Sequence, residues 1–405
     1  MGENRDYAVK TSGLGKGCVT QLAGIICLLL LVGYGVLWSG LVQQKGGAES
    51  YVLRTPFLAV LTGAEIVAGP APELLYDIQA QVSAQQTVLA TDLDPSVLLP
   101  YRDPPFGAVA LAPLVRAHAS YSLLFTAWAV LTTTSAGLCI GMLAGRWPTA
   151  QGTPWLLMLA ATSFLPLITS LMQGQSAVLV LLGWVGLTVG LKSGQDLTAG
   201  IIAALIALQP ANWPALLLVL LVTRRLRALA ALLGAVVVGC ASVMPLLGAA
   251  WPSAYLRLLL DRPPFDWVTL LATLVGGAFL LWVWRRPPGA TAAWLPQTDG
   301  WDMRWAITLL VALLLTSGGG VSALVFAVVP GWIIGSRLAN GLMPGAQRRF
   351  WSVWLPLGYA LGLLLVLLPG PSLPLGLVWA VGALAAGIWT LPQAEPMLSN
   401  TTPTL

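Results

Sequence analysis

The chain alternates between long apolar segments and short polar connections. After a polar, basic start, the apolar segments cover roughly residues 22–42, 107–145, 154–169, 175–191, 198–222, 228–249, 267–284, 305–335, 351–368 and 374–391. A helix of about 20 apolar residues is long enough to cross a hydrocarbon core of about 30 Å. The pattern therefore predicts an all-α, polytopic integral membrane protein. We expect one membrane domain, residues 1–405, with no separable soluble domain.

Composition and charge agree with this interpretation. Apolar residues make up 57% of the 405 residues and charged residues only 9%, whereas about a quarter of a soluble domain is charged. The net charge is +5, but the basic residues stand in ones and twos between apolar segments, a pattern that sets membrane orientation. We therefore expect no nucleic-acid partner. No known metal, nucleophile, phosphate-loop or dinucleotide motif is present, so we expect no metal and no cofactor.

The basic residues also predict that one apolar segment is a broken hairpin. As a single span, residues 198–222 would place Lys192 and the cluster "RRLR" at 224–227 on opposite sides of the membrane, against the positive-inside rule. The segment is interrupted by "LQPANWP", where Pro210 and Pro214 each remove a backbone donor. Two half-length helices that meet at residues 209–214 bring both basic ends to the cytoplasmic side.

The same argument applies to residues 305–335. Arg304 and Arg337 flank this segment, and three glycines at 318–320 interrupt it. The resulting topology has a cytoplasmic N-terminus (1–18), a first extracytoplasmic loop with short helices (44–106) and a polar C-terminal tail (392–405). Most of the 20 basic residues then lie on the cytoplasmic side, which is the plasma membrane's inner face in a prokaryote. The first loop, the turn at 172–176 and both breaks converge on the outer face, where irregular backbone can line a site.

The first loop carries the candidate carboxylates. A short helix over residues 55–69 is expected, with Thr55 as its N-cap and Pro56 at its first position. Glu65 is the only charge on this helix, and it is either a site carboxylate or an acid that reaches interfacial water. Asp77, which follows Tyr76, is either a helix cap or a member of the site.

A third carboxylate precedes the next apolar segment in "LPYRDPPFG". Here Tyr101, Arg102 and Asp103 either contact an anionic head group or form a rigid turn with a local Arg-Asp pair. The single histidine, His118, has no acid or nucleophile at helical spacing, so we expect a packing or interfacial role for it.

Several stretches, taken in order, resemble the glycosyltransferases of GT-C fold, and family 87 among them, a polyprenyl-phosphate-mannose-dependent mannosyltransferase-like group. They are "PFLAVLTGAEIVAGPAPELLYD", "YRDPPFGAVALAPL", "QGQSAVLVLLGWVGLTVGLKSGQDLTAGIIAALIALQP" and "RRLRAL". The resemblance covers about residues 20–335. It implies transfer of a sugar from a polyprenyl-phosphate donor to a glycan or glycolipid acceptor on the extracytoplasmic face, in contact with membrane lipid.

The chain departs from the family pattern at three polar positions. Pro56 stands where the family has an aspartate, Gln209 stands where it has a lysine, and "TSGGGVSALVF" replaces a Ser-Pro-His segment. If the chain is an enzyme, its base is Glu65, Asp77 or Asp103. The expected substrate-binding residues are Arg54, Tyr76, Tyr101, Arg102, Gln173, Gln175, Gln209 and Asn212.

Two other hypotheses stay open. The missing polar residues favour a non-catalytic relative that binds a lipid-linked sugar or a partner membrane protein. A transporter built from inverted repeats is less favoured, because the two halves show no matched broken segments of similar sequence.

Overall fold

The computed structural model describes residues 51–53, 55–89, 98–149, 154–261, 267–285, 299–315, 324–343 and 348–357, together with 21, 25–29, 31–36, 39–40, 43, 47 and 345. Within these ranges the chain forms helices and turns and contains no strand, which confirms the all-α prediction. The expected segments at 1–18, 374–391 and 392–405 lie outside the described residues.

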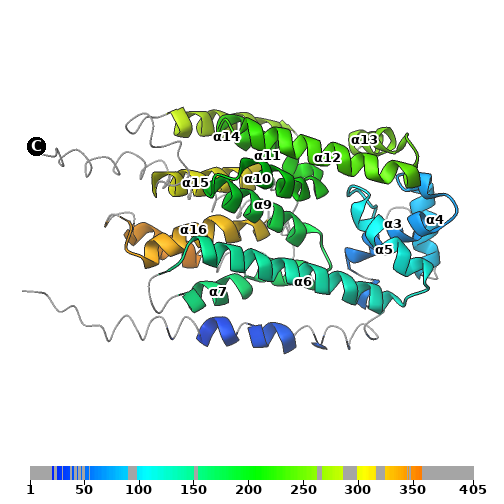
Figure 1. The fold of residues 1–405 in the computed structure, drawn as a ribbon. Helices are drawn as coiled ribbons and strands as arrows, with labels where there is room; N and C mark the ends of the chain where they lie inside the picture. Colours follow the sequence, from blue (N-terminus) through cyan, green and yellow to red (C-terminus); the bar gives the residue numbers. More distant parts are fainter. Residues whose placement is uncertain are drawn as a thin grey trace, which may run out of the picture.

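Figure 1 shows a bundle of roughly aligned helices with a group of shorter helices at one end. In chain order the α-helices are α3 (Phe57–Ala68), α4 (Ile78–Leu89), α5 (Phe106–Arg116), α6 (Tyr121–Arg146), α7 (Pro154–Thr162), α8 (Leu165–Met172), α9 (Ala177–Lys192), α10 (Asp196–Ala203), α11 (Trp213–Val222), α12 (Leu226–Leu247), α13 (Trp251–Asp261), α14 (Trp267–Arg285), α15 (Asp299–Leu315) and α16 (Val328–Ala339). Short 3-10 helices are η1 (Pro72–Leu74), η3 (Ala204–Leu208) and η4 (Pro210–Asn212).

Two of the described helices, α6 and α12, are long and apolar enough to cross a membrane. The pair α7 and α8 makes a third such span if it is counted as one, although it bends by 48° at its break. The bend precedes Pro166, in the first turn of α8, and a proline has no N–H with which to continue the hydrogen bonds of a preceding helix. Their length and composition are those of membrane-spanning helices.

The apolar segment expected over 107–145 is two helices, α5 and α6, rather than one. His118 adopts a positive φ of 55° and ends the first helix. Ser120 then starts the second, because its hydroxyl accepts a hydrogen bond from the Leu123 N–H. Apolar composition alone did not reveal this break, since the intervening "AHAS" is short and only weakly polar.

The first predicted break is present. Gln209 has an extended backbone conformation between η3 and η4, and Pro210 begins η4. The two arms return to the same end of the bundle. Asp196 Oδ1, at the start of α10, lies 3.5 Å from the Arg225 guanidinium, just after α11.

In the second hairpin, the start of α15 lies close to α16. Near the start of α15, Asp302 pairs with Lys192 at 2.6 Å and with Arg337 of α16 at 3.5 Å. Arg146, at the end of α6, donates to the Lys192 carbonyl oxygen at 2.7 Å. The basic ends of α6, α9 and α16 therefore meet at one end of the bundle, as the charge pattern predicted. The glycines at 318–320 lie outside the described residues.

Glycines let the broken hairpin pack closely against its neighbours. On α9, a Cβ at Gly183 or Gly190 would lie 2.8 Å from Ile206 or 2.7 Å from Ala199. On α10, a Cβ at Gly200 would overlap the carbonyl oxygen of Ala228 in α12. Small residues allow such close approach between helices in a membrane, where packing replaces the hydrophobic effect as the driving force.

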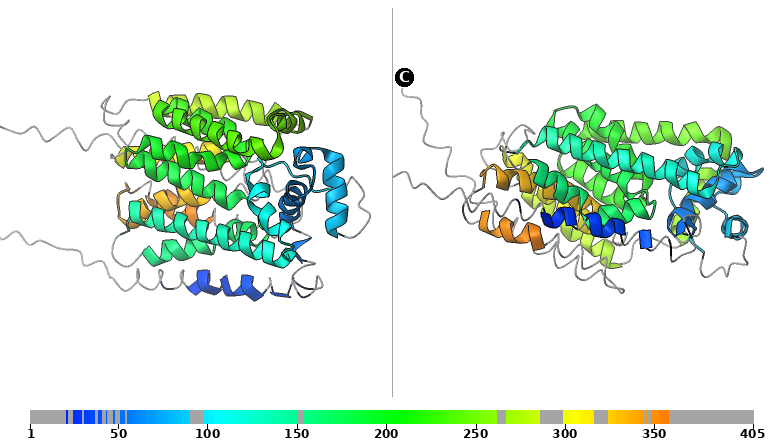
Figure 2. Two further views of the ribbon diagram at one scale, coloured as in Figure 1. Left: turned by 45° about the vertical axis from the view of Figure 1, so that its right-hand side comes forward. Right: turned by 90° about the horizontal axis from the view of Figure 1, so that it is seen from below.

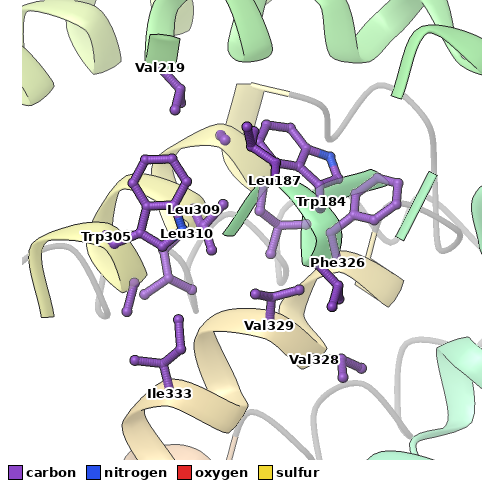
Figure 3. Close-up of a cluster of buried hydrophobic side chains, with 14 of the residues drawn as sticks. Trp184, Leu187, Val219, Trp305, Leu309, Leu310, Phe326, Val328, Val329 and Ile333 are labelled. Atoms are coloured by element: carbon purple, nitrogen blue, oxygen red, sulfur yellow. The ribbon is translucent and has the colours of Figure 1, made fainter. Parts of the chain in front are cut away.

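Figure 3 shows the apolar core where α9, α11, α15 and α16 meet. Trp184 and Leu187 of α9 face Leu309 of α15 and Val329 of α16. A small crevice in this core is lined only by apolar side chains: Trp184, Leu309, Ala312, Leu313, Phe326 and Val329. It is therefore a packing feature of the bundle, with no group that could act on a substrate.

A second cluster of buried apolar residues joins α3, α5 and the start of α6 to α12 and α13. Both views of Figure 2 show α3 and α4 at the end of the bundle opposite the orange helix α16. The first-loop helices thus lie at the opposite end from the basic cluster.

Candidate functional site

A chain of polar side chains runs from the first loop to the broken hairpin. The Ser176 hydroxyl donates to Asp103 Oδ2 at 2.9 Å. Gln209 Nε2 donates to Ser176 Oγ at 3.4 Å, and Asn212 Nδ2 donates to Gln209 Oε1 at 3.2 Å. The structure therefore brings together three of the sequence-predicted site residues, Asp103, Gln209 and Asn212, through a fourth residue, Ser176.

The turn before α9 positions Ser176. Gly174 has a φ of +63°, and an added Cβ there would lie 2.9 Å from the Phe57 Cβ at the start of α3. The Gly174 carbonyl oxygen accepts a hydrogen bond from Trp128 Nε1 at 2.9 Å. Only glycine combines this conformation with so close an approach. The turn is thereby held against α3 and α6, next to Pro56.

The environment of Asp103 keeps its carboxyl group a weaker acid than usual. Burial raises the pKa of Asp103 from 3.8 to about 6, while the hydrogen bond from Ser176 lowers it. A carboxylate with a pKa just below neutrality is ionised at pH 7 and can still accept a proton in a reaction.

Four aromatic side chains lie beside this carboxylate. Tyr76 stacks on Tyr101 with ring centroids 6.4 Å apart, and it contacts Tyr255 at 4.9 Å and Trp251 at 6.3 Å. The Tyr76 hydroxyl donates to the Asp103 carbonyl oxygen at 3.2 Å. Burial and the nearby Asp103 charge raise the pKa of Tyr255, so its hydroxyl stays protonated and can donate a hydrogen bond.

Several buried polar atoms around this site make no hydrogen bond to any described residue. They are Arg102 Nε, Asn212 Oδ1, Trp251 Nε1 and Tyr255 Oη. Buried polar atoms are normally paired, so each such group needs an explanation such as a bound ligand or water. Together they offer three donors and one acceptor. By contrast, Tyr101 is fully buried and donates to the Pro104 carbonyl oxygen at 2.5 Å, which gives it a structural role.

The two glutamines of the turn bond to each other rather than to Asp103. Gln175 Nε2 donates to Gln173 Oε1 at 2.7 Å, and Gln175 Oε1 accepts from the Ser170 hydroxyl at 3.1 Å. Both lie within the turn that ends at Ser176.

The structure does not bring the other two candidate carboxylates to this cluster. Glu65 lies in the second half of α3, where burial raises its pKa and the nearby His118 lowers it. It is eight residues beyond Phe57, about 12 Å along the helix. Asp77 is exposed and caps α4, because its Oδ1 accepts a hydrogen bond from the Ala80 N–H at 2.8 Å.

Two further expectations concern the start of α3. Thr55 does not cap the helix: its hydroxyl donates backwards to the Val52 carbonyl oxygen at 2.7 Å, and Pro56 occupies the N-cap position without a side-chain bond. A preceding turn at residues 52–55 competes for the hydroxyl, which local sequence did not reveal. Arg54 lies outside the described residues.

Two glutamines of α4 fix the segment that leads to Asp103. Gln81 donates to the Tyr101 carbonyl oxygen at 3.2 Å and accepts from the Tyr101 N–H at 2.9 Å. Gln85 forms the same reciprocal pair with Leu99, at 3.1 Å in each direction. Side chains four residues apart on one helix face therefore hold an extended segment as a neighbouring strand would.

The sequence reasoning missed Ser176, Trp251 and Tyr255 as site residues. Ser176 lies in the "QGQS" turn whose glutamines were chosen, and its position just before a helix was a usable signal. Trp251 and Tyr255 are one helical turn apart in the connection after the sixth apolar segment, and this i, i+4 aromatic spacing predicts a shared helix face.

Within the described ranges, no three His, Cys, Asp or Glu side chains are grouped as metal ligands would be. No protein-family model, curated protein or solved structure matches this chain.

Proposed function

We propose that the chain is a polytopic membrane glycosyltransferase of GT-C type that moves a sugar from a polyprenyl-phosphate donor to an acceptor hydroxyl at the extracytoplasmic face. The observation that carries the proposal is the Asp103, Ser176, Gln209 and Asn212 chain at the helix break, at the opposite end of the bundle from the basic residues. The positive-inside rule assigns the basic end to the cytoplasm.

In this proposal Asp103 is the general base. Its carboxylate takes the acceptor hydroxyl proton while the acceptor oxygen bonds to the anomeric carbon of the sugar. The bond from that carbon to the phosphate oxygen breaks, and polyprenyl phosphate leaves with the electron pair. A positioned base of this kind contributes about 10²–10⁴-fold to rate.

The neighbouring side chains support binding of such substrates. Arg102 adjoins the base in sequence and has a buried Nε that makes no hydrogen bond to a described residue, so it can hold phosphate oxygens. The Asn212 Oδ1 and Tyr255 Oη atoms can pair with sugar hydroxyls. Trp251 and Tyr76 are buried and pack their rings beside Tyr255. A few polar groups among aromatic side chains are typical of small-ligand sites.

The structure also suggests how a proline at position 56 is compatible with activity. Phe57 packs on Gly174, two residues before the Ser176 hydroxyl that holds Asp103. In this proposal Asp103 takes over the role of the family's aspartate from a different element. Glu65 and Asp77 do not meet this requirement, because one lies beside His118 and the other caps α4.

The purified, reconstituted chain can be tested against a panel of polyprenyl-phosphate sugars with simple glycan and glycolipid acceptors. The proposal expects sugar transfer with at least one donor, measured as radiolabelled product. Saturable donor binding without transfer or hydrolysis across the panel contradicts the proposal and favours the non-catalytic alternative.

A further inference from the structure

The outward side of α13 carries apolar side chains that the rest of the protein leaves uncovered. Leu256 and Leu260, four residues apart, are 55% and 65% exposed. Arg257 and Ser253 are exposed on the same side of the helix. The exposed side of α13 therefore carries two leucines, Leu256 and Leu260, next to two polar residues, Ser253 and Arg257.

The inward side of α13 is anchored at the candidate site. Trp251 and Leu258 are buried, and the rings of Trp251 and Tyr255 contact Tyr76 of the first loop. Leu74 and Ile78, on either side of Tyr76, are also exposed. We call Leu74, Ile78, Leu256 and Leu260 the α13 patch.

Apolar residues are also exposed on α12, a helix that has the length and composition of a membrane span. Val237 and Val238 of α12 are 66% and 69% exposed, and the chain passes from α12 to α13 through Gly248, whose φ is 77°. The chain changes direction at this glycine, and α13 lies beside the first-loop helices at the end of the bundle (Figures 1 and 2).

The chemistry of this surface fits a lipid interface. Tryptophan and tyrosine gather where a membrane meets water. Trp251 and Tyr255 of α13 contact Tyr76 of the first loop, which stacks on Tyr101. An interfacial helix carries leucines on its lipid side and a cation beside the head groups. Arg257, next to Leu256 and Leu260 on the exposed side, meets the second condition.

We propose that α13 is an interfacial helix, whose Leu256 and Leu260 side chains enter the hydrocarbon edge of the bilayer leaflet at this end of the bundle while Arg257 contacts lipid head groups. Leu74 and Ile78 enter the same layer. The inference goes beyond the transfer reaction and holds whether or not the chain turns over a sugar. It places the candidate site at the lipid surface, within reach of a lipid-borne substrate.

Single-cysteine variants of the full chain test this inference. In a chain whose cysteines at 18, 27, 139 and 240 are replaced by alanine, a bimane label is attached to L256C or L260C and the protein is reconstituted in phosphatidylcholine bilayers. Quenching is measured with lipids brominated near the head group, with lipids brominated deep in the acyl chain, and with aqueous iodide.

Two matched positions calibrate the measurement. Val237→Cys labels the exposed side of α12, and Ser83→Cys labels an exposed polar position of α4 in the same first loop. We expect shallow bromolipids to quench labels at 256 and 260 more than deep ones, and iodide to quench them at least about twofold less than at 83. The label at 237 should be quenched by deep bromolipids.

Three outcomes overturn the inference, and they are distinguishable. If the label at 237 reports lipid while labels at 256 and 260 respond to iodide as at 83, α13 lies in water. If labels at 256 and 260 are protected from both iodide and bromolipid, protein covers the patch, for example a second copy of the chain. If bromolipids do not quench the label at 237 either, both the membrane assignment of α12 and the inference about α13 are wrong.

A second measurement uses the unmodified chain and does not depend on a cysteine-free variant that folds. A lipid with a photoactivatable diazirine in its acyl chain is added to the reconstituted protein, and labelled peptides are identified by mass spectrometry. We expect labels within residues 254–260 and within α12, and none at residues 81–88 of α4. An unlabelled 254–260 peptide beside a labelled α12 would contradict the proposal.

Discussion

Replacing Ser176 by alanine should weaken the base without removing it. The Ser176 hydroxyl donates to Asp103 Oδ2 at 2.9 Å, and this hydrogen bond lowers the Asp103 pKa. A hydrogen bond to a charged group contributes about 1.5–3 kcal/mol, and one pKa unit corresponds to about 1.4 kcal/mol. Its loss should therefore raise the Asp103 pKa from about 6 by about one to two units.

The consequence is a shift in the acid limb of the pH profile. With a pKa of about 6, about nine-tenths of Asp103 is ionised at pH 7. With a pKa of about 7 to 8, the ionised fraction falls to between about a half and a tenth. We expect S176A to lose about two- to tenfold of its transfer rate at pH 7 and to recover most of it near pH 9.

The assay is the rate of sugar transfer from a lipid-linked donor between pH 5 and pH 9. Ser176→Thr keeps a hydroxyl and should keep the midpoint of the acid limb near that of the native chain. Ser170→Ala is the matched control, because the Ser170 hydroxyl donates to Gln175 Oε1 rather than to the Asp103 carboxylate. An acid limb that S176A leaves unmoved, in a chain that still transfers sugar, would refute the role assigned to this hydrogen bond.

Three further predictions concern stability. Burial raises the pKa of Asp103 in the folded state from 3.8 to about 6. Ionisation of Asp103 therefore costs the folded state up to about 3 kcal/mol above pH 6 and nothing below about pH 4. Asp103→Asn should raise the Tm at pH 8 but not at pH 4, and an equal effect at both pH values would contradict this. Gly200→Ala forces a Cβ into the backbone of α12 and should destabilise the chain by about 1–3 kcal/mol. Gly137 has open space around it, so Gly137→Ala should not destabilise the chain. Equal melting temperatures of the two variants in detergent would contradict the packing described for α10. Gln85→Ala removes the two hydrogen bonds between Gln85 and the Leu99 backbone. It should lower the free energy of unfolding by about 1–3 kcal/mol and speed proteolysis of the first loop, while Gln79→Ala, at an exposed position, should do neither. Equal proteolysis rates in the two variants would show that these hydrogen bonds do not hold the segment.

Much of the architecture was predictable because it follows from local chemistry. Pro210 and its neighbours cannot complete the helical hydrogen bonds, so a break at Gln209 was readable from the sequence. The sidedness of the basic residues then required the arms to return, and the contact of Asp196 with Arg225 confirms that they do. The short helix of the first loop was also predicted, to within two residues at its start and one at its end.

The site was only partly predictable because its contacts join distant residues. The sequence singled out Asp103, Gln209 and Asn212 separately, but nothing local showed that Ser176 would connect them, 73 positions after Asp103. Glu65 was attractive as the only charge on its helix. Which side of α3 faces the turn at 172–176 depends on the close approach of Phe57 to Gly174, which no helical periodicity reveals.

Asp103, alone among the three first-loop carboxylates Glu65, Asp77 and Asp103, is the proposed base that takes the acceptor proton. The direct test compares sugar transfer by Asp103→Asn, Glu65→Gln and Asp77→Asn in chains that elute and melt as folded protein. Each substitution removes a charge and keeps the side-chain shape, so they are matched controls for one another. The account predicts a loss of about 10²–10⁴-fold for Asp103→Asn and little change for the other two. Retained transfer in Asp103→Asn, or a comparable loss in Glu65→Gln or Asp77→Asn, would contradict it.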